Sequence, residues 1–371
     1  MRRFYRESRY NAVKNISRQS NWELMRILAM LMIVAGHFIG QSQYMSYVSM
    51  GDVCEWFGVY FGRGARIAVN MFLLLGCWFM VDTTFRARRI TKLYFNVWTM
   101  TVPITLVVLL LGYHPAGKDI VRGFVPFLGK ALWFASAYIA LVLVTPWLNK
   151  TFLLSKRSLR NLLILLTCLI NLWVTIYSFD RMEDQWLDCL VSFMWTYLFV
   201  GYYKRYCMLT FNKWLVLFIG IGSYLLLTTV AHVTNNMSGI GYIIGHMINN
   251  FLTDYKTIPN LFVAMCFFYF FQNVHIGEVK CINYIAQGAF STYIIHQTPA
   301  FIHVLWYDVY DCKNGFLEYN PMLYSVFVVG SVYLVCLLVE QFRRRYIEPI
   351  LFELSIVRRF EAQLDRFYNK V

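Results

Sequence analysis

The stretch Trp22–Gly40, WELMRILAMLMIVAGHFIG, decides the fold of this chain, because it is long and apolar yet contains Arg26 and His37. A transmembrane helix needs about 20 mostly apolar residues. An ionisable group inside such a helix is unfavourable, so its presence suggests a functional role. At 1.5 Å per residue the two side chains lie roughly 16 Å apart along the helix. We therefore expect Arg26 near one membrane face and His37 deep toward the other.

The composition of the whole chain agrees with a membrane protein. The chain is 58% hydrophobic and 15% charged, whereas a typical soluble domain has about 25% charged residues. We therefore expect an all-α fold, a polytopic membrane bundle of about ten transmembrane helices, forming a single domain over residues 1–371 with a polar segment at 1–21 and a tail at 343–371. The predicted spans are 22–40, 65–81, 93–113, 131–148, 162–179, 187–203, 213–233, 258–274, 285–306 and 321–342.

The net charge of +14 would suggest a nucleic-acid partner in a soluble protein. With the predicted spans in place, however, 26 of the 34 Lys and Arg residues fall on one side, together with both termini. The positive-inside rule assigns that side to the cytoplasm. We therefore expect a multi-pass cell-membrane protein whose basic residues contact membrane lipid, with no nucleic-acid partner.

Four motifs occur in order along the predicted spans. The Arg-x10-His of the first span is followed by Arg86-x-x-Arg89 before the third, Leu132-Trp133-Phe134 at the start of the fourth and Tyr293-x-x-His296 in the ninth. In this order and spacing the chain resembles the integral-membrane acyltransferases of acyltransferase family three, which include polysaccharide O-acetyltransferases. The resemblance covers essentially the whole chain.

One position departs from that family's pattern. The second span contains Gly76-Cys77-Trp78, where many relatives have Ser-Gly followed by an aromatic residue. The residues at these positions are still small, but Gly76 stands where those relatives have the serine and its hydroxyl. We interpret the site as one of close helix packing rather than of chemistry.

The resemblance implies that the chain is bacterial and moves an acyl group, usually acetyl, from cytosolic acyl-CoA to a hydroxyl of an extracytoplasmic or lipid-linked glycan. Acetyl-CoA is the expected donor, and polysaccharide biosynthesis proteins are the expected partners. Arg26, Arg86 and Arg89 lie at the predicted cytoplasmic level, and their planar guanidinium groups suit the phosphates of coenzyme A. The alternative is that these arginines only set the topology. Glu23 is expected to pair with Arg26 three residues later.

The two histidines are the predicted reaction centre. His37 and His296 fall at a similar depth if the ninth span begins near residue 282. A neutral imidazole can take a proton near neutral pH, so we expect His37 to act as the base toward the acceptor hydroxyl, or as a covalent acyl carrier. His296 or Asn70 would donate to the developing oxyanion, and Trp133 would contact substrate. A purely structural role stays open for each of these residues. For Asn70 that role would be a hydrogen bond between two helices.

Two rival functions remain at this stage. A secondary transporter or exporter of a lipid-linked or small anionic substrate would also place ionisable groups inside the membrane. We see no inverted repeat and no pair of broken helices in the sequence, which argues against a transporter. A non-catalytic acyl-binding sensor is the other rival. The spacing of His, Cys, Asp and Glu predicts no metal site. If the chain is an acyltransferase, a polar passage should connect the arginines with His37.

Overall fold

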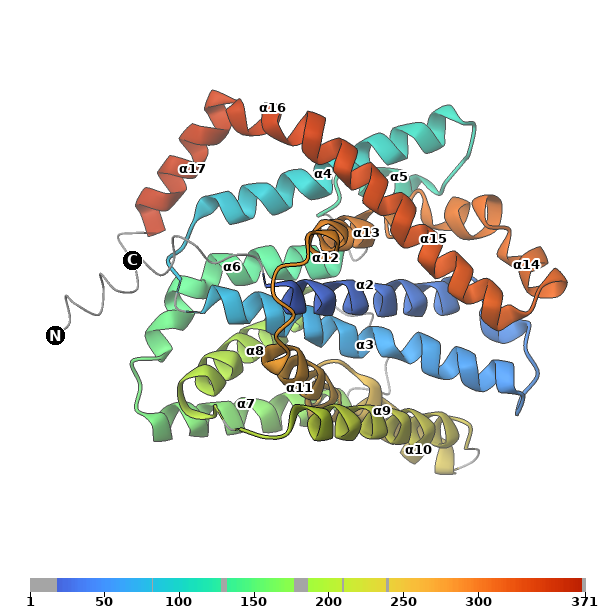
Figure 1. Ribbon diagram of the computed structural model, residues 1–371, viewed down its shortest axis with the longest axis horizontal. Coiled ribbons are helices and arrows are strands. Elements are labelled where there is room, and N and C mark those ends of the chain that lie inside the picture. Colours follow the sequence, from blue (N-terminus) through green and yellow to red (C-terminus); the bar gives the residue numbers. More distant parts are fainter. Residues whose placement is uncertain are drawn as a thin grey trace.

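The computed structural model describes residues 19–81, 83–127, 132–176, 186–208, 210–237 and 240–368, and every regular element in these ranges is helical (Figure 1). The predicted all-α fold is therefore confirmed. Within the described ranges, nine of the ten predicted spans correspond to one long helix each. These are α2 (Ser20–Gln41), α3 (Val53–Met80), α4 (Ala87–Leu110), α6 (Trp133–Thr151), α7 (Lys156–Ile176), α8 (Trp186–Tyr206), α9 (Lys213–Asn235), α11 (Ile258–Asn273) and α15 (Pro321–Phe342).

Five helices of the described part are long and apolar enough to cross a membrane. They are Ser20–Gln41, Ala87–Leu110, Lys156–Thr175, Lys213–Asn235 and Pro321–Glu353. The molecule is therefore built as a membrane protein, while the count of about ten spans and the cytoplasmic location of the termini stay predictions. Most of the predicted amino-terminal segment, residues 1–18, lies outside the described residues.

The ninth predicted span, 285–306, is not a continuous helix, so that prediction was wrong. The chain instead forms α12 (Lys280–Ile285), the 3-10 turn η4 (Ala286–Gly288), α13 (Ala289–His296) and the π-helical segment η5 (Val304–Val309). Pro299 gives the reason, because proline lacks a backbone N–H and disfavours helical geometry at the residue before it. The mostly apolar stretch continues past Pro299, so hydropathy alone did not predict this break.

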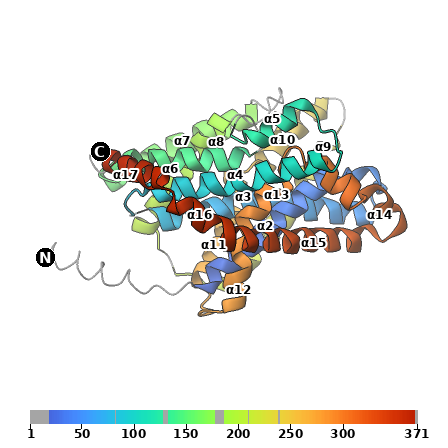
Figure 2. The same ribbon diagram turned by 90° about the horizontal axis from the view of Figure 1, so that it is seen from above.

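Helix α2 occupies the middle of the bundle, beside α3 and in contact with α13 and α15 (Figures 1 and 2). Gly36 sets the depth at which α2 and α3 meet. A Cβ atom there would overlap the Cβ of Ala65 and lie 2.7 Å from the carbonyl oxygen of Gly62. Small residues permit this close approach of two membrane helices. His37 is therefore held level with the stretch of α3 around Gly62 and Ala65.

The carboxyl-terminal helices cover the start of α4. The backbone N–H of Ala87 donates to Asp365 on α17 at 2.7 Å, and Arg88 forms an ion pair with Glu361 at 3.5 Å. Both contacts hold the tail against the same end of the bundle. The remaining short helices are η2 (Tyr44–Ser46), α5 (Gly117–Phe124), α10 (Ile240–Thr253), α14 (Cys312–Glu318), η6 (Arg343–Ile347), α16 (Glu348–Glu353) and α17 (Ser355–Tyr368).

Candidate active site

Two internal cavities lie along α2, one toward each end of the helix. The first, here called the histidine cavity, has a volume of about 710 Å³ and is lined by His37 and Trp133 among others. The second, here called the arginine cavity, has a volume of about 410 Å³ and is lined by Arg26 and Arg89 among others. His37 and Trp133 therefore line one cavity, and Arg26 and Arg89 line the other.

The imidazoles of His37 on α2 and His296 on α13 are in direct contact. The Nδ1 of His37 lies 2.8 Å from the Nε2 of His296. His296 is completely buried, and its Nδ1 bonds the carbonyl oxygen of Thr292 one turn earlier. The structure thus brings together two residues that the sequence placed at similar depth.

This network determines which nitrogen of each neutral ring is protonated. A carbonyl oxygen only accepts, so the Nδ1 of His296 must be the donor to Thr292. The Nε2 of His296 is then an acceptor, and the Nδ1 of His37 must donate to it. The Nε2 of His37 is left with its lone pair. His37 lines the histidine cavity, so this network prepares a base at the cavity wall.

Arg26 and Arg89 face the same arginine cavity from two helices, whereas Arg86 does not line it. The expected ion pair between Arg26 and Glu23 is confirmed, with an N–O distance of 2.7 Å. Arg89 donates to the hydroxyl of Thr83 at 3.1 Å and forms no ion pair with a carboxylate within the described ranges. Arg89 therefore keeps donor groups for an anionic ligand. Arg86 immediately precedes α4 in extended backbone geometry, and its side chain is exposed.

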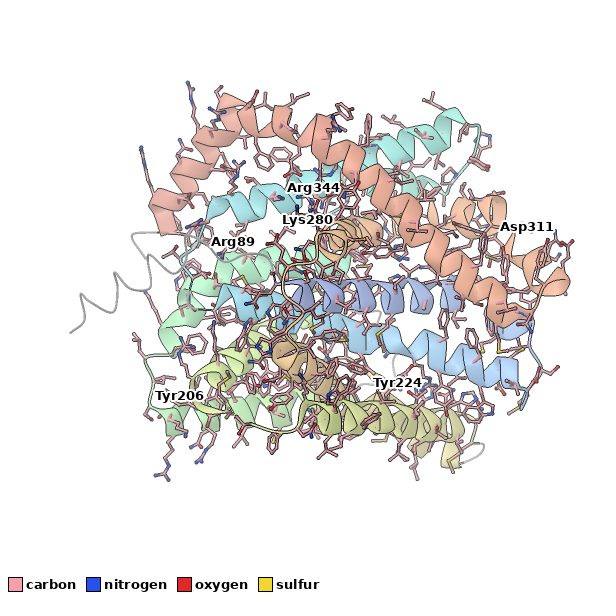
Figure 3. All side chains as sticks on the ribbon, in the orientation of Figure 1. Arg89, Tyr206, Tyr224, Lys280, Asp311 and Arg344 are labelled. Carbon is pink, nitrogen blue, oxygen red and sulfur yellow. The ribbon has the colours of Figure 1, made fainter. Side chains whose placement is uncertain are left out.

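Sequence reasoning missed two further arginines that line this cavity, Arg343, which is paired with Glu340 and Glu348, and Arg344. Arg344, in η6, lines the cavity and donates to Gln287 at 2.9 Å. Arg89 and Arg344 lie toward the end of the bundle where α2 begins, and Asp311 lies toward the opposite end (Figure 3). The sequence has three arginines in a row directly after the apolar span 321–342. Such a cluster is also common where basic residues only set the orientation of a membrane helix, so it did not indicate a cavity.

The two cavities share a wall of three phenylalanine side chains, Phe72, Phe134 and Phe290. The lining that the two cavities share is apolar, and the predicted polar passage between the arginines and His37 stays a prediction. These rings come from α3, α6 and α13, and their meeting depends on how three distant helices pack. A periodic apolar pattern does not say which aromatic residues fill the interior.

Trp133 and Asn70 differ in how they relate to the histidine pair. Trp133 lines the histidine cavity and stacks on Tyr255 with ring centroids 5.3 Å apart. Asn70 is buried, and its amide donates to the carbonyl oxygen of Tyr255 at 2.7 Å. It does not line either cavity. These contacts favour the interhelical alternative for Asn70 over a role as oxyanion donor.

Tyr293 is a second residue that sequence reasoning did not select. It lies on α13, lines the histidine cavity and is only 5% exposed. Its hydroxyl proton has no acceptor within the described ranges. Its ring contacts Phe134 and Phe290 of the shared wall, both with centroids 6.2 Å away. A buried polar group without an acceptor is unfavourable unless a ligand supplies one.

The group packed against Gly76 is a side chain and not the backbone of a neighbouring helix. The predicted close helix packing at this position is therefore a contact with one tyrosine. Gly76 lines the arginine cavity together with Tyr138. A Cβ atom at Gly76 would lie 2.6 Å from the Tyr138 hydroxyl. The glycine that replaces the serine of many relatives thus leaves room for a tyrosine hydroxyl in the same cavity.

Comparison with known proteins agrees with this architecture. The family model described as an acyltransferase domain, that of acyltransferase family three, matches residues 19–341. The chain therefore belongs to this family of membrane acyltransferases, and the resemblance drawn from the motifs is confirmed. No curated protein and no solved structure matches the sequence.

Proposed function

We propose that this acyltransferase moves an acetyl group from acetyl-CoA to a hydroxyl of an extracytoplasmic or lipid-linked glycan. The observation that carries the proposal is the contact between His37 and His296 at the wall of a cavity large enough for a sugar. Pockets for small molecules commonly have volumes of about 300–1,000 Å³. A second cavity rich in arginine adjoins the first across one layer of side chains.

The donor binds in the arginine cavity. Arg26, Arg89 and Arg344 present guanidinium groups that suit the phosphates of coenzyme A through bidentate hydrogen bonds. The charge bias of the loops assigns this end of the bundle, and both termini, to the cytoplasm of a bacterial cell. The pantetheine arm then carries the thioester toward the histidine cavity. The phenylalanine side chains of the shared wall must move aside for the two substrates to meet.

The acceptor binds in the histidine cavity, where His37 activates its hydroxyl. The Nε2 of His37 takes the hydroxyl proton as the oxygen attacks the thioester carbonyl. The resulting positive charge on His37 is stabilised through the bond from its Nδ1 to His296. The C–S bond then breaks, the acyl group remains on the acceptor oxygen, and the proton passes from His37 to the departing thiolate. A covalent acyl-His37 intermediate is the alternative route.

Tyr293 is the best placed donor to the oxyanion. Its hydroxyl proton lacks an acceptor, and its ring touches the wall that the thioester must cross. The donors first considered are already used, because the N–H of His296 donates to the carbonyl oxygen of Thr292 and the amide of Asn70 donates to that of Tyr255. A hydroxyl fixed beforehand toward developing negative charge is a large contribution in acyl transfer.

Transfer of label from acetyl-CoA to a glycan extract tests the proposal with the purified full-length protein. We expect labelled glycan from the unchanged protein and none from His37→Ala. The matched control is His303→Ala, because the His303 side chain is 78% exposed and does not line either cavity. A transporter or a sensor would label no glycan in any variant, and that outcome would refute the proposal.

The acceptor must reach this site from the outer side or be supplied there by polysaccharide biosynthesis proteins. The proposed orientation is tested separately, with a reporter fused after Val371. We expect a cytoplasmic reporter. An external location would mean that the number of spans is odd.

A further inference from the structure

We infer that the histidine cavity recognises an acceptor with an anionic group, a carboxylate or a phosphate, and that Arg63 and Arg66 of α3 bind this group. The inference rests on the proposed function and names the chemical class of its acceptor. Both arginines line the histidine cavity. Neither was given a role from sequence, where they counted only as basic residues on the outer side.

The first argument is the depth of the two arginines. Gly36 of α2 packs directly against Gly62 and Ala65 of α3. His37 follows Gly36, and Arg63 and Arg66 each follow one of the two residues that Gly36 contacts. The arginines are therefore level with the histidine that activates the hydroxyl. An anionic group held by them would lie on the same sugar unit as that hydroxyl or on its immediate neighbour.

The second argument is electrostatic. Residues three apart on a helix are neighbours on its surface, and like charges at this spacing are unfavourable. Two guanidinium groups at the wall of one cavity repel each other unless an anionic partner lies between them. Within the described ranges neither arginine forms an ion pair with a carboxylate, and the recorded partner of Arg63 is the neutral side chain of Asn249 at 3.1 Å.

The carboxylate in the same cavity is bonded to other groups than these two arginines. Glu55 lines the histidine cavity, but one of its oxygens bonds the Nε2 of His232 at 3.2 Å. Its other oxygen accepts from the backbone N–H of Gly51 at 2.6 Å. The two guanidinium groups therefore remain available for the planar, bidentate hydrogen bonds that carboxylates and phosphates accept.

Matched acceptors test the inference with the full-length protein in nanodiscs and labelled acetyl-CoA. The acceptors are methyl glucoside, methyl glucuronide, glucose 1-phosphate and a polyprenyl-diphosphate-linked glucose. The measured quantity is kcat/KM for each acceptor. We expect the charged acceptors to exceed the neutral one by about 10- to 100-fold, the range of a charge-assisted hydrogen bond. A sugar carboxylate and a lipid-linked diphosphate are distinguished by which charged acceptor is fastest.

Variants then assign the preference to its residues. Arg63→Gln and Arg66→Gln should each reduce the ratio of charged to neutral kcat/KM by about tenfold or more. Arg63→Lys and Arg66→Lys should retain part of it, because charge remains while bidentate geometry is lost. Arg122→Gln is the control for general attraction, since Arg122 lies on α5 outside the cavity. It should leave the ratio unchanged.

Two results would overturn the inference. One is equal use of neutral and charged acceptors by the unchanged protein. The other is an equal loss with both kinds of acceptor in the glutamine variants. No label in any acceptor would instead contradict the proposed function itself, so the two failures are distinguishable.

Discussion

The Nδ1 of His37 lies 2.8 Å from the Nε2 of His296, a residue 259 positions later in the chain. Because the Nδ1 of His296 must donate to the Thr292 carbonyl, the second histidine orients the first and fixes its tautomer. His37 thus lines the histidine cavity and is the proposed base, and His296 is buried behind it and positions its ring.

The orienting role predicts graded effects at His296. His296→Ala should lower kcat by roughly 10- to 100-fold, within the range found for orienting groups, while the KM for acetyl-CoA stays similar. His296→Gln should recover about a tenth or more of the lost rate, because its amide oxygen can still accept from His37. Steady-state kinetics with both variants check this. Identical rates for alanine and glutamine would contradict the tautomer argument.

Arg89 and Arg86 provide a matched pair for donor binding. Arg89→Ala should raise the KM for acetyl-CoA by about 10- to 100-fold, because a charged hydrogen-bond donor is removed from the arginine cavity. Arg86→Ala should have a much smaller effect, since Arg86 is exposed and does not line that cavity. Equal effects on KM would show that the phosphates bind at the surface of the loop instead.

The phenylalanine wall should prevent water from reaching the thioester. We expect Phe290→Ala to join the two cavities, to increase hydrolysis of acetyl-CoA without acceptor by about tenfold, and to lower transfer, since closure against water suppresses such side reactions. The control is Phe327→Ala, because Phe327 on α15 is 65% exposed. Release of free coenzyme A measures the leak. Unchanged hydrolysis in the Phe290 variant would refute the barrier.

The contact between Gly76 and Tyr138 predicts a compensating pair. Gly76→Ala should destabilise the protein by about 1–3 kcal/mol, because its Cβ would lie 2.6 Å from the Tyr138 hydroxyl. Tyr138→Leu should relieve that overlap. The double variant should therefore lose less free energy of unfolding than the two single variants lose together. Thermal unfolding in detergent gives the comparison. Strict additivity would mean that the two residues do not interact.

Local features of the fold followed from the sequence. The predicted span 22–40 appears as the helix Ser20–Gln41, because a run of apolar residues specifies a membrane helix without reference to the rest of the chain. The ion pair of Arg26 with Glu23 is equally local, since residues three apart share a helix face. The ordered motifs also sufficed to place the chain in its family.

The contacts that define the site were not local. Tyr293, Arg344 and the wall containing Phe290 were missed because their partners lie on other helices, at rotations that no single helix specifies. Within the described ranges, the sequence by itself determined where nine of the long helices form, and it placed the chain in its family. Only the tertiary structure decided which side chains meet, because helix rotation is set by packing among all the helices at once.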